Sequence, residues 1–198
     1  MNPPPPLILA STSRYRHELL QRLQMPFDVR APHVDETPLA GEAPPALALR
    51  LALAKARAVS AQHRAAVVIG SDQVADLDGE PIGKPHTRER AREQLAAMSG
   101  RRVVFQTAVA VVRADRGFER ALLAPVTVRF RVLDAASIER YLQLDQPYDC
   151  AGSAKSESLG VALLESIESD DPTALVGLPL IRTCELLRAA GLDPLADR

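Results

Sequence analysis

The sequence predicts an α/β fold built on a mixed β-sheet with flanking helices. Apolar segments of strand length alternate with segments of helical periodicity along the whole chain, which is typical of α/β proteins. Tight turns at Asp78-Gly79 and Asp115-Arg116-Gly117 lie between strand-like segments and indicate antiparallel pairs in the sheet. The 198 residues, of which 46% are hydrophobic, fit one domain with a substantial core. Two lobes around a cleft would also fit this pattern.

Strands and helices alternate through the first half of the chain. The cap-forming residues Ser11-Thr12-Ser13 precede leucines at helical spacing, which predicts a helix N-terminus at this point. The unbroken run Val67-Val68-Ile69 is typical of a central strand. The predicted elements are a strand over 7–10, a helix over about 13–24, a strand over 27–30, a loop over 32–45, a helix over 46–62 and a strand over 65–74.

Turn and cap residues divide the second half. Asp78-Gly79 predicts a two-residue hairpin turn, and Thr87 and Asp134 predict helix N-termini. Gly100 stands where a helix C-terminal cap belongs, and Pro179 is suited to the start of a last helix. The predicted elements are a strand over 80–82, a helix over 87–98, strands over 103–113 and 121–132, a helix over 134–144, a strand over 161–167 and a helix over 179–191.

The overall charge argues against two classes of protein. Lys and Arg number 24 and Asp and Glu number 25, so the net charge of −1 suits neither a basic nucleic-acid coat protein nor an acidic tail protein. Residues 1–6 lack the features of a secretory signal, and no stretch approaches the ~18 apolar residues of a membrane helix. Cys150 and Cys184 form no C-x-x-C pair. We expect a single cytoplasmic domain over 1–198 with a flexible tail at 1–6, reduced thiols, and no nucleic-acid or membrane partner.

Several common catalytic motifs are absent from the sequence. Gly79 and Gly83 are too close together for a phosphate loop, and Pro85 stands where such a loop has a Ser or Thr that holds magnesium. The histidines show no H-x-x-x-H spacing, which together with isolated cysteines argues against a zinc site. The chain also lacks the G-x-S-x-G elbow of serine hydrolases.

Two segments of the first half suggest a phosphate site and a metal site. Arg14 and Arg16 lie at a helix N-terminus, where cations are unfavourable unless an anion joins them. Hydroxyls and arginines there indicate a phosphate site, and the alternative is an ordinary capped helix with solvated arginines. The adjacent carboxylates Asp35 and Glu36 could ligate magnesium, which prefers hard oxygen ligands, or could form a solvated turn.

Polar residues also interrupt a strand and fill a loop. Ser71-Asp72-Gln73 breaks what should be a buried strand, and a buried carboxylate is costly unless it is paired or metal-bound, so we favour a functional role. Lys84 lies across the Asp78-Gly79 turn and could return to the same end of the sheet as Asp72. Residues 150–160 are small, polar and flanked by glycines, as in a binding loop or a plain surface loop.

In combination and order, these segments resemble the Maf family of nucleoside triphosphate pyrophosphatases. The resemblance extends from Leu7 to about Gly191. No single marker is specific, but the set in this order is. The markers are Leu9-Ala10-Ser11-Thr12-Ser13 with Arg16, Val34-Asp35-Glu36, Lys55, Gly70-Ser71-Asp72, Gly83-Lys84-Pro85, Ala151-Gly152 and Val176-Gly177-Leu178-Pro179-Leu180.

The resemblance implies a two-lobed fold like that of inosine triphosphate pyrophosphatases, in a family that is often dimeric. It implies hydrolysis of a nucleoside triphosphate to the monophosphate and diphosphate with a divalent metal, Mg²⁺ or Mn²⁺. Asp72 matches the family's proton acceptor and, with Glu36, is expected at the metal. The other matches near phosphate or metal are Ser13, Arg16, Lys55 and Lys84. We expect Lys55, Lys84 and Arg16 to stabilise charge that develops on the phosphates.

Three positions track base preference in the family: Tyr15, Gln73 and Glu157. They are similar to the branch that acts on 7-methyl-GTP, whereas the dTTP/UTP branch has Arg, Thr and Gln there. A carboxylate can accept both N–H donors of guanine, and a tyrosine face favours a cationic methylated base. Arg14 and His17 depart from the family's usual Pro and Arg. The expected role is to clear modified nucleotides.

Two other functions stay open at this point. One is hydrolysis of dTTP or UTP, as in the sister branch. The other is a non-catalytic, nucleotide-binding regulator of cell division, although such a protein has no need of Asp72 beside lysines, and a net charge of −1 gives no broad basic face. Release of diphosphate from a panel of nucleotides separates the alternatives.

Overall fold

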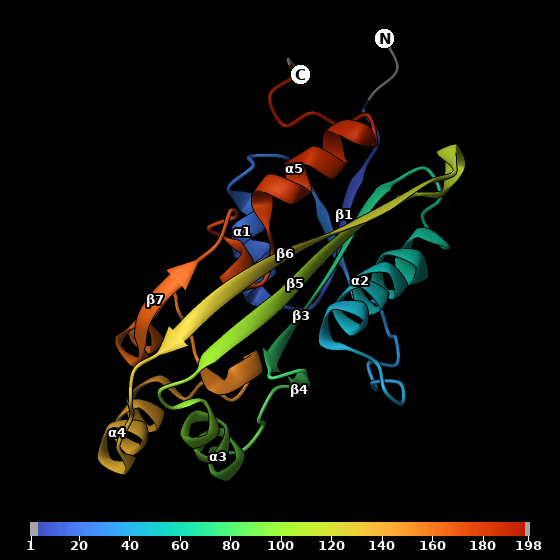
Figure 1. Ribbon diagram of the computed structural model, residues 1–198. Helices are drawn as coiled ribbons and strands as arrows, with labels where there is room; N and C mark the ends of the chain where they lie inside the picture. The colour runs from blue at the N-terminus through green and yellow to red at the C-terminus, as the bar shows by residue number, and fades with distance from the viewer. Residues whose placement is uncertain (1–3, 197–198) are drawn as a thin grey trace.

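A seven-stranded mixed sheet runs through the whole molecule (Figure 1). The computed structural model describes residues 4–196, and within them the strand order is β2-β1-β3-β5-β6-β7, with β4 paired to β3. β1 pairs in parallel with β2 and β3, and the other pairs are antiparallel, so the predicted mixed sheet is confirmed. The strands are β1 Leu7–Ala10, β2 Asp28–Arg30, β3 Val67–Leu77, β4 Glu80–Ile82, β5 Arg102–Arg113, β6 Phe118–Phe130 and β7 Leu164–Glu168.

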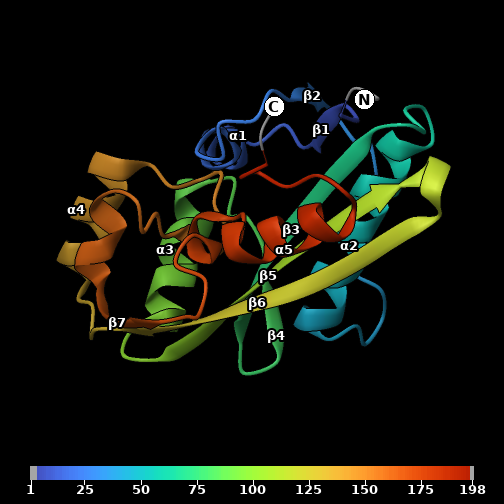
Figure 2. The same ribbon diagram turned by 90° about the horizontal axis from the view of Figure 1, so that it is seen from above.

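The helices gather at two ends of this sheet (Figures 1 and 2). The α-helices are α1 Arg14–Gln21, α2 Pro44–Ser60, α3 Arg88–Met98, α4 Ala135–Asp145 and α5 Leu180–Ala189. Short 3₁₀ turns are η1 Ala114–Arg116, η2 Ala151–Ser153, η3 Leu159–Leu163 and η4 Ala174–Val176. Within residues 4–196, none of the helices has the length and apolar character needed to cross a bilayer.

Separate apolar cores define two lobes. In the first lobe, α1 and α5 pack on one face of the sheet around Leu20 and Leu187, and α2 packs on the other face around Leu51. In the second lobe, α3 and α4 pack together around Leu95 and Leu142. The expected two-lobed α/β architecture is therefore confirmed, and β3, β5 and β6 continue from one lobe into the other.

Three of the predicted helix starts are confirmed by capping bonds, whereas the helix predicted over 46–62 runs over Pro44–Ser60 and has no side-chain cap. The side chains of Ser13, Thr87 and Asp134 each accept a hydrogen bond from a backbone N–H in the first turn of α1, α3 and α4. Such bonds satisfy donors that a helix start leaves unpaired. Gly117, with φ of +61°, follows η1 in the tight connection between β5 and β6, where a left-handed residue is needed.

Some element boundaries differ from the predictions. The segment 161–167 is not a continuous strand, because η3 extends to Leu163 and β7 begins at Leu164, opposite the end of β6 at Phe130. β6 starts at Phe118, because its pairing with β5 extends beyond its hydrophobic segment. β3 continues to Leu77, because its last residues pair with β4. The predicted tail at 1–6 falls partly outside the described residues.

Gly70 sets the distance between β3 and α2. A Cβ at this position would lie 2.2 Å from the carbonyl oxygen of Ala52 and 2.6 Å from the backbone nitrogen of Ala56. The absence of a side chain therefore lets the helix lie directly on the strand, which brings Lys55 of α2 over Asp72 of β3.

We expect Gly70→Ala to lower the free energy of unfolding by about 1–3 kcal/mol or more, because two backbone segments must move apart. Urea unfolding followed by circular dichroism measures the change. Gly83→Ala is the matched control, since a Cβ there would meet nothing within 4 Å. Equal stability of the two variants would contradict the close approach.

Candidate active site

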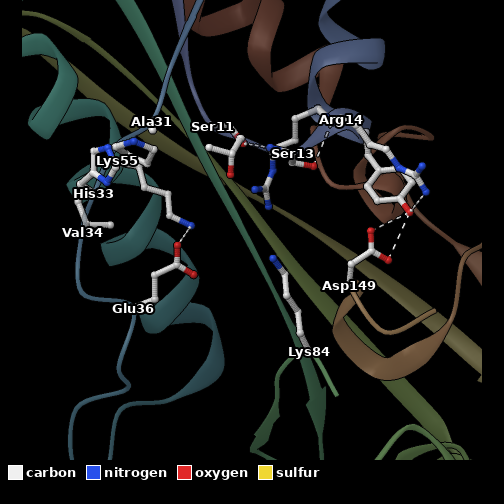
Figure 3. A pocket seen from close by; sticks show the side chains of 14 residues that line it. Ser11, Ser13, Arg14, Ala31, His33, Val34, Glu36, Lys55, Lys84 and Asp149 are labelled. Atoms are coloured by element: carbon white, nitrogen blue, oxygen red, sulfur yellow. Dashed lines mark hydrogen bonds and ion pairs between the residues drawn. The ribbon is translucent and has the colours of Figure 1, made fainter. Parts of the chain in front are cut away.

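A cleft lined by residues from both lobes contains a cavity of about 480 Å³ (Figure 3). The first lobe supplies the start of α1, the loop after β2 and Lys55, and the second lobe supplies Lys84 and Asp149. Two adjoining cavities share Arg16 and Lys84 with the first. Together, these cavities are lined by every site residue predicted from the sequence: Ser13, Tyr15, Arg16, Glu36, Lys55, Asp72, Gln73, Lys84 and Glu157.

Lys55 joins the two predicted carboxylates. Its Nζ donates to Oδ1 of Asp72 at 2.6 Å and lies 2.7 Å from Oε1 of Glu36. Lys55 and Asp72 are 5% and 7% exposed, whereas Glu36 reaches the cluster from an exposed loop. A buried ammonium held between two carboxylates satisfies the rule that buried charges are paired, and it fixes the position of Asp72.

The surrounding positive charges favour the ionised form of Glu36. Desolvation by itself would raise the pKa of Glu36, but the hydrogen bond from Lys55 and the charges of Lys55, Lys84 and Arg16 outweigh it and lower that pKa. Burial lowers the pKa of Arg16, and the negative charges of Asp72 and Glu36 oppose this shift. The cavity that Asp72 lines therefore has three cations, Arg16, Lys55 and Lys84, and two anions, Glu36 and Asp72, and this local excess of positive charge favours an anionic ligand.

The start of α1 is anchored to a segment far along the chain. Nε of Arg16 donates to the carbonyl oxygen of Gly177 at 2.8 Å, and Oγ of Ser71 donates to the same oxygen at 3.0 Å. Gly177 itself has φ of +119°, which a residue with a side chain rarely adopts. The predicted marker Val176-Gly177-Leu178 thus positions Arg16, a role that the sequence did not reveal.

A smaller cavity of about 70 Å³, here called the slot, shares lining residues with the first and is also lined by Tyr15, Gln73 and Glu157. Nε2 of Gln73 donates to Oγ1 of Thr107 at 2.9 Å and to the carbonyl oxygens of Ala174 and Leu175, each at 3.0 Å. Since the amide nitrogen is committed to the protein, Oε1 is the atom of Gln73 left to contact a ligand.

Comparisons with known proteins show the family of this chain. The family described as Maf-like protein matches residues 6–190, nearly the whole chain. The chain belongs to the Maf family. A relative from Polaromonas sp., named 7-methyl-GTP pyrophosphatase, is 67% identical over 193 residues, which cover 98% of this chain and 88% of the relative.

Other Maf relatives carry the same name. The protein from Albidiferax ferrireducens is 62% identical over 96% of this chain and 95% of its own length. The protein from Bordetella pertussis is 60% identical over 97% of this chain and 96% of its own length. Among solved structures, the Ham1 protein of Staphylococcus aureus aligns with a TM-score of 0.46 at 18% identity, over 63% of this chain and 71% of that one.

The two departures from the usual Maf helix start have distinct surroundings. The ring of His17 packs edge-on against Phe27, with centroids 5.2 Å apart, so His17 belongs to the packing of α1. Arg14 is exposed and lies over Tyr15 at the cleft. Arg16 is therefore the arginine of α1 that lines all three cavities.

The cysteines lie apart from the charged cluster of this Maf protein. Both are free thiols, as predicted. Cys150 lines the slot, and burial raises its pKa to about 12. At neutral pH the thiol is protonated and therefore a poor nucleophile.

The donor set fits a magnesium-like ion. Glu36 and Asp72 offer hard carboxylate oxygens, and no group of three or more His, Cys, Asp or Glu side chains within residues 4–196 is placed to hold a metal. Mg²⁺ is commonly bound by one or two carboxylates together with substrate phosphates and water. A carboxylate pair beside cavities lined by Arg16, Lys55 and Lys84 suits that mode of binding.

Proposed function

We propose that this Maf protein hydrolyses 7-methyl-GTP to 7-methyl-GMP and diphosphate, and thereby clears a modified nucleotide. The observation that carries the proposal is a set of three cavities that share Arg16 and Lys84. The Glu36–Lys55–Asp72 cluster lines one of them, and Tyr15 and Glu157 line the slot. The names of relatives that are 60–67% identical over nearly the full chain support the same substrate.

The reaction needs a base and a place for the phosphates. In the proposed mechanism, Asp72 takes a proton from the water that attacks the α-phosphorus. The bond between this phosphorus and the oxygen that bridges the α- and β-phosphates breaks. Because Oδ1 of Asp72 accepts from Lys55, we assign the proton to Oδ2. The diphosphate leaves as an anion, and Arg16 and Lys84 stabilise its developing charge.

A divalent metal completes the proposed site. Glu36 and Asp72 are the residues that would hold it, together with phosphate oxygens. When bound, Mg²⁺ or Mn²⁺ supplies positive charge that polarises the phosphoryl oxygens. Lys55 holds both carboxylates in position, with its Nζ within 2.7 Å of each.

Base recognition is proposed for the slot. Glu157 can accept from both N–H groups of the guanine pairing edge, which a pyrimidine does not offer. Desolvation raises the pKa of Glu157, and the charge of Lys155 opposes that shift. The tyrosine ring favours the positive charge that methylation places on the base, worth about 0.5–2 kcal/mol.

We expect Glu157→Gln to reduce kcat/KM for 7-methyl-GTP and for GTP by about 10-fold, because an amide cannot accept both guanine donors and leaves one unpaired. Steady-state kinetics on both nucleotides measures this loss. Glu93→Gln, on the exposed side of α3, is the control and should retain wild-type kinetics. Unchanged guanine kinetics in Glu157→Gln would remove this residue from base recognition.

The position of bond cleavage tests the proposed reaction. Purified protein is incubated with 7-methyl-GTP and magnesium, and the products are separated by ion-exchange chromatography. The proposal expects equal amounts of 7-methyl-GMP and diphosphate. Formation of 7-methyl-GDP and inorganic phosphate would overturn the assignment of attack at the α-phosphorus.

A further inference from the structure

Arg14, Tyr15 and Asp149 form a cluster of charged and aromatic side chains that lines the large cavity, and Figure 3 labels Arg14 and Asp149. The hydroxyl of Tyr15 donates to Asp149, with Oδ2 at 3.2 Å, and accepts from Nη2 of Arg14 at 2.8 Å. The guanidinium carbon of Arg14 lies 4.7 Å from the centre of the Tyr15 ring. Tyr15 and Asp149 are separated by 134 positions in the chain, so the fold alone brings them together.

The ring of Tyr15 and the carboxylate of Asp149 both suit a positively charged ligand. An aromatic face attracts a cation, and in the structure the guanidinium of Arg14 lies against that face. Asp149 adds a negative charge at the hydroxyl of Tyr15, and it lines both the large cavity and the slot. Asp149 also accepts from Sγ of Cys150 at 3.5 Å, and it forms an ion pair with Lys155, whose Nζ is 3.6 Å away and donates to the carbonyl oxygen of Asp145 at the end of α4.

We propose that Asp149 is the counter-ion for a positively charged nucleobase and that Arg14 competes with this base for the face of Tyr15. The inference rests on the proposed function, in which a nucleotide base enters the slot. A purine methylated at N7 carries a delocalised positive charge and gains from both the carboxylate and the ring. A neutral guanine gains little from the carboxylate.

The two residues should therefore act in opposite directions on selectivity. Loss of the Asp149 charge removes an electrostatic attraction that acts on the cationic base but not on neutral guanine. Loss of the Arg14 charge removes an electrostatic repulsion that acts on the cationic base but not on neutral guanine. Contacts of Arg14 with the triphosphate are common to both nucleotides, so they cancel in the ratio of kcat/KM for 7-methyl-GTP to that for GTP.

The test compares this ratio in Asp149→Asn and Arg14→Ala with the wild type. We expect Asp149→Asn to lower it about threefold to tenfold and Arg14→Ala to raise it about threefold, in line with a single cation–π or exposed charge contact. Asp28→Asn and Arg92→Ala are matched controls on exposed positions outside the cavities and should leave the ratio unchanged. Circular dichroism verifies that each variant is folded.

Binding of the products separates this inference from the proposed function. Calorimetry with 7-methyl-GMP and GMP should show the same opposite shifts in the ratio of the two Kd values. If the wild type cleaved neither nucleotide, the proposed function would fail, yet the Kd ratios would still decide the role of Asp149. Ratios that stay at the wild-type value in both folded variants would overturn the inference.

Discussion

Replacing Asp72 by asparagine is expected to slow diphosphate release by at least about 100-fold, the loss typical of removing a general base. Asparagine has almost the same shape as aspartate, but its amide cannot take the proton of the attacking water. The substitution leaves Glu36 in contact with Lys55, so this buried ammonium keeps one carboxylate partner. We therefore expect a folded protein whose defect lies in kcat.

A control on the same strand separates chemistry from general damage. Asp76 lies on β3 and accepts from Nε2 of Gln106 and from the backbone of Gly79, away from the cavities. Asp76→Asn should keep turnover close to that of the wild type. Near-normal turnover of Asp72→Asn, with circular dichroism confirming its fold, would show that another group accepts the proton.

Removal of divalent metal is expected to abolish activity altogether. Within residues 4–196 the structure offers two carboxylates, Glu36 and Asp72, in place of a closed cage of ligands. A metal held so openly should exchange readily, because its remaining ligands are phosphate oxygens and water. Treatment with EDTA should therefore stop diphosphate release, and excess magnesium or manganese should restore it.

The metal content of the EDTA-treated protein has to be measured, because residual metal could sustain diphosphate release. Full turnover in chelator, with metal shown to be absent by atomic emission, would remove the metal from the mechanism. The cluster of Arg16, Lys55 and Lys84 would then carry the whole charge stabilisation. Recovery with magnesium after EDTA also shows that the chelator did not denature the protein.

Much of the fold could be predicted from the sequence because local signals are strong here. The unbroken apolar run at Val67, the caps at Ser13 and Thr87, and the Asp78-Gly79 turn each depend on short-range chemistry, and the structure confirms all of them. The start of β7 was predicted less well, since it depends on where β6 ends at Phe130 and on η3, neither of which is visible in periodicity.

Some site residues could likewise be recognised from their neighbours in the sequence, whereas the roles of others depend on contacts between distant segments. Asp72 was conspicuous because a carboxylate in a buried strand requires a partner, and the structure supplies Lys55. Ser71 and Gln73 were equally conspicuous, but their contacts with Gly177 and Ala174 join segments about a hundred positions apart. Asp149 gave no signal, since its relation to Tyr15 exists only in the folded chain.

The most direct test of the account is the order of kcat/KM across 7-methyl-GTP, GTP, dTTP, UTP and CTP, with magnesium present and diphosphate as the readout. We expect 7-methyl-GTP to be cleaved best, GTP next and the pyrimidine nucleotides least. The carbonyl oxygens of uracil and thymine would face the acceptor Glu157, at a cost of about 1–3 kcal/mol for each unpaired group. Fastest cleavage of dTTP or UTP would contradict the assignment of the base, and no diphosphate from any nucleotide would contradict the proposed reaction.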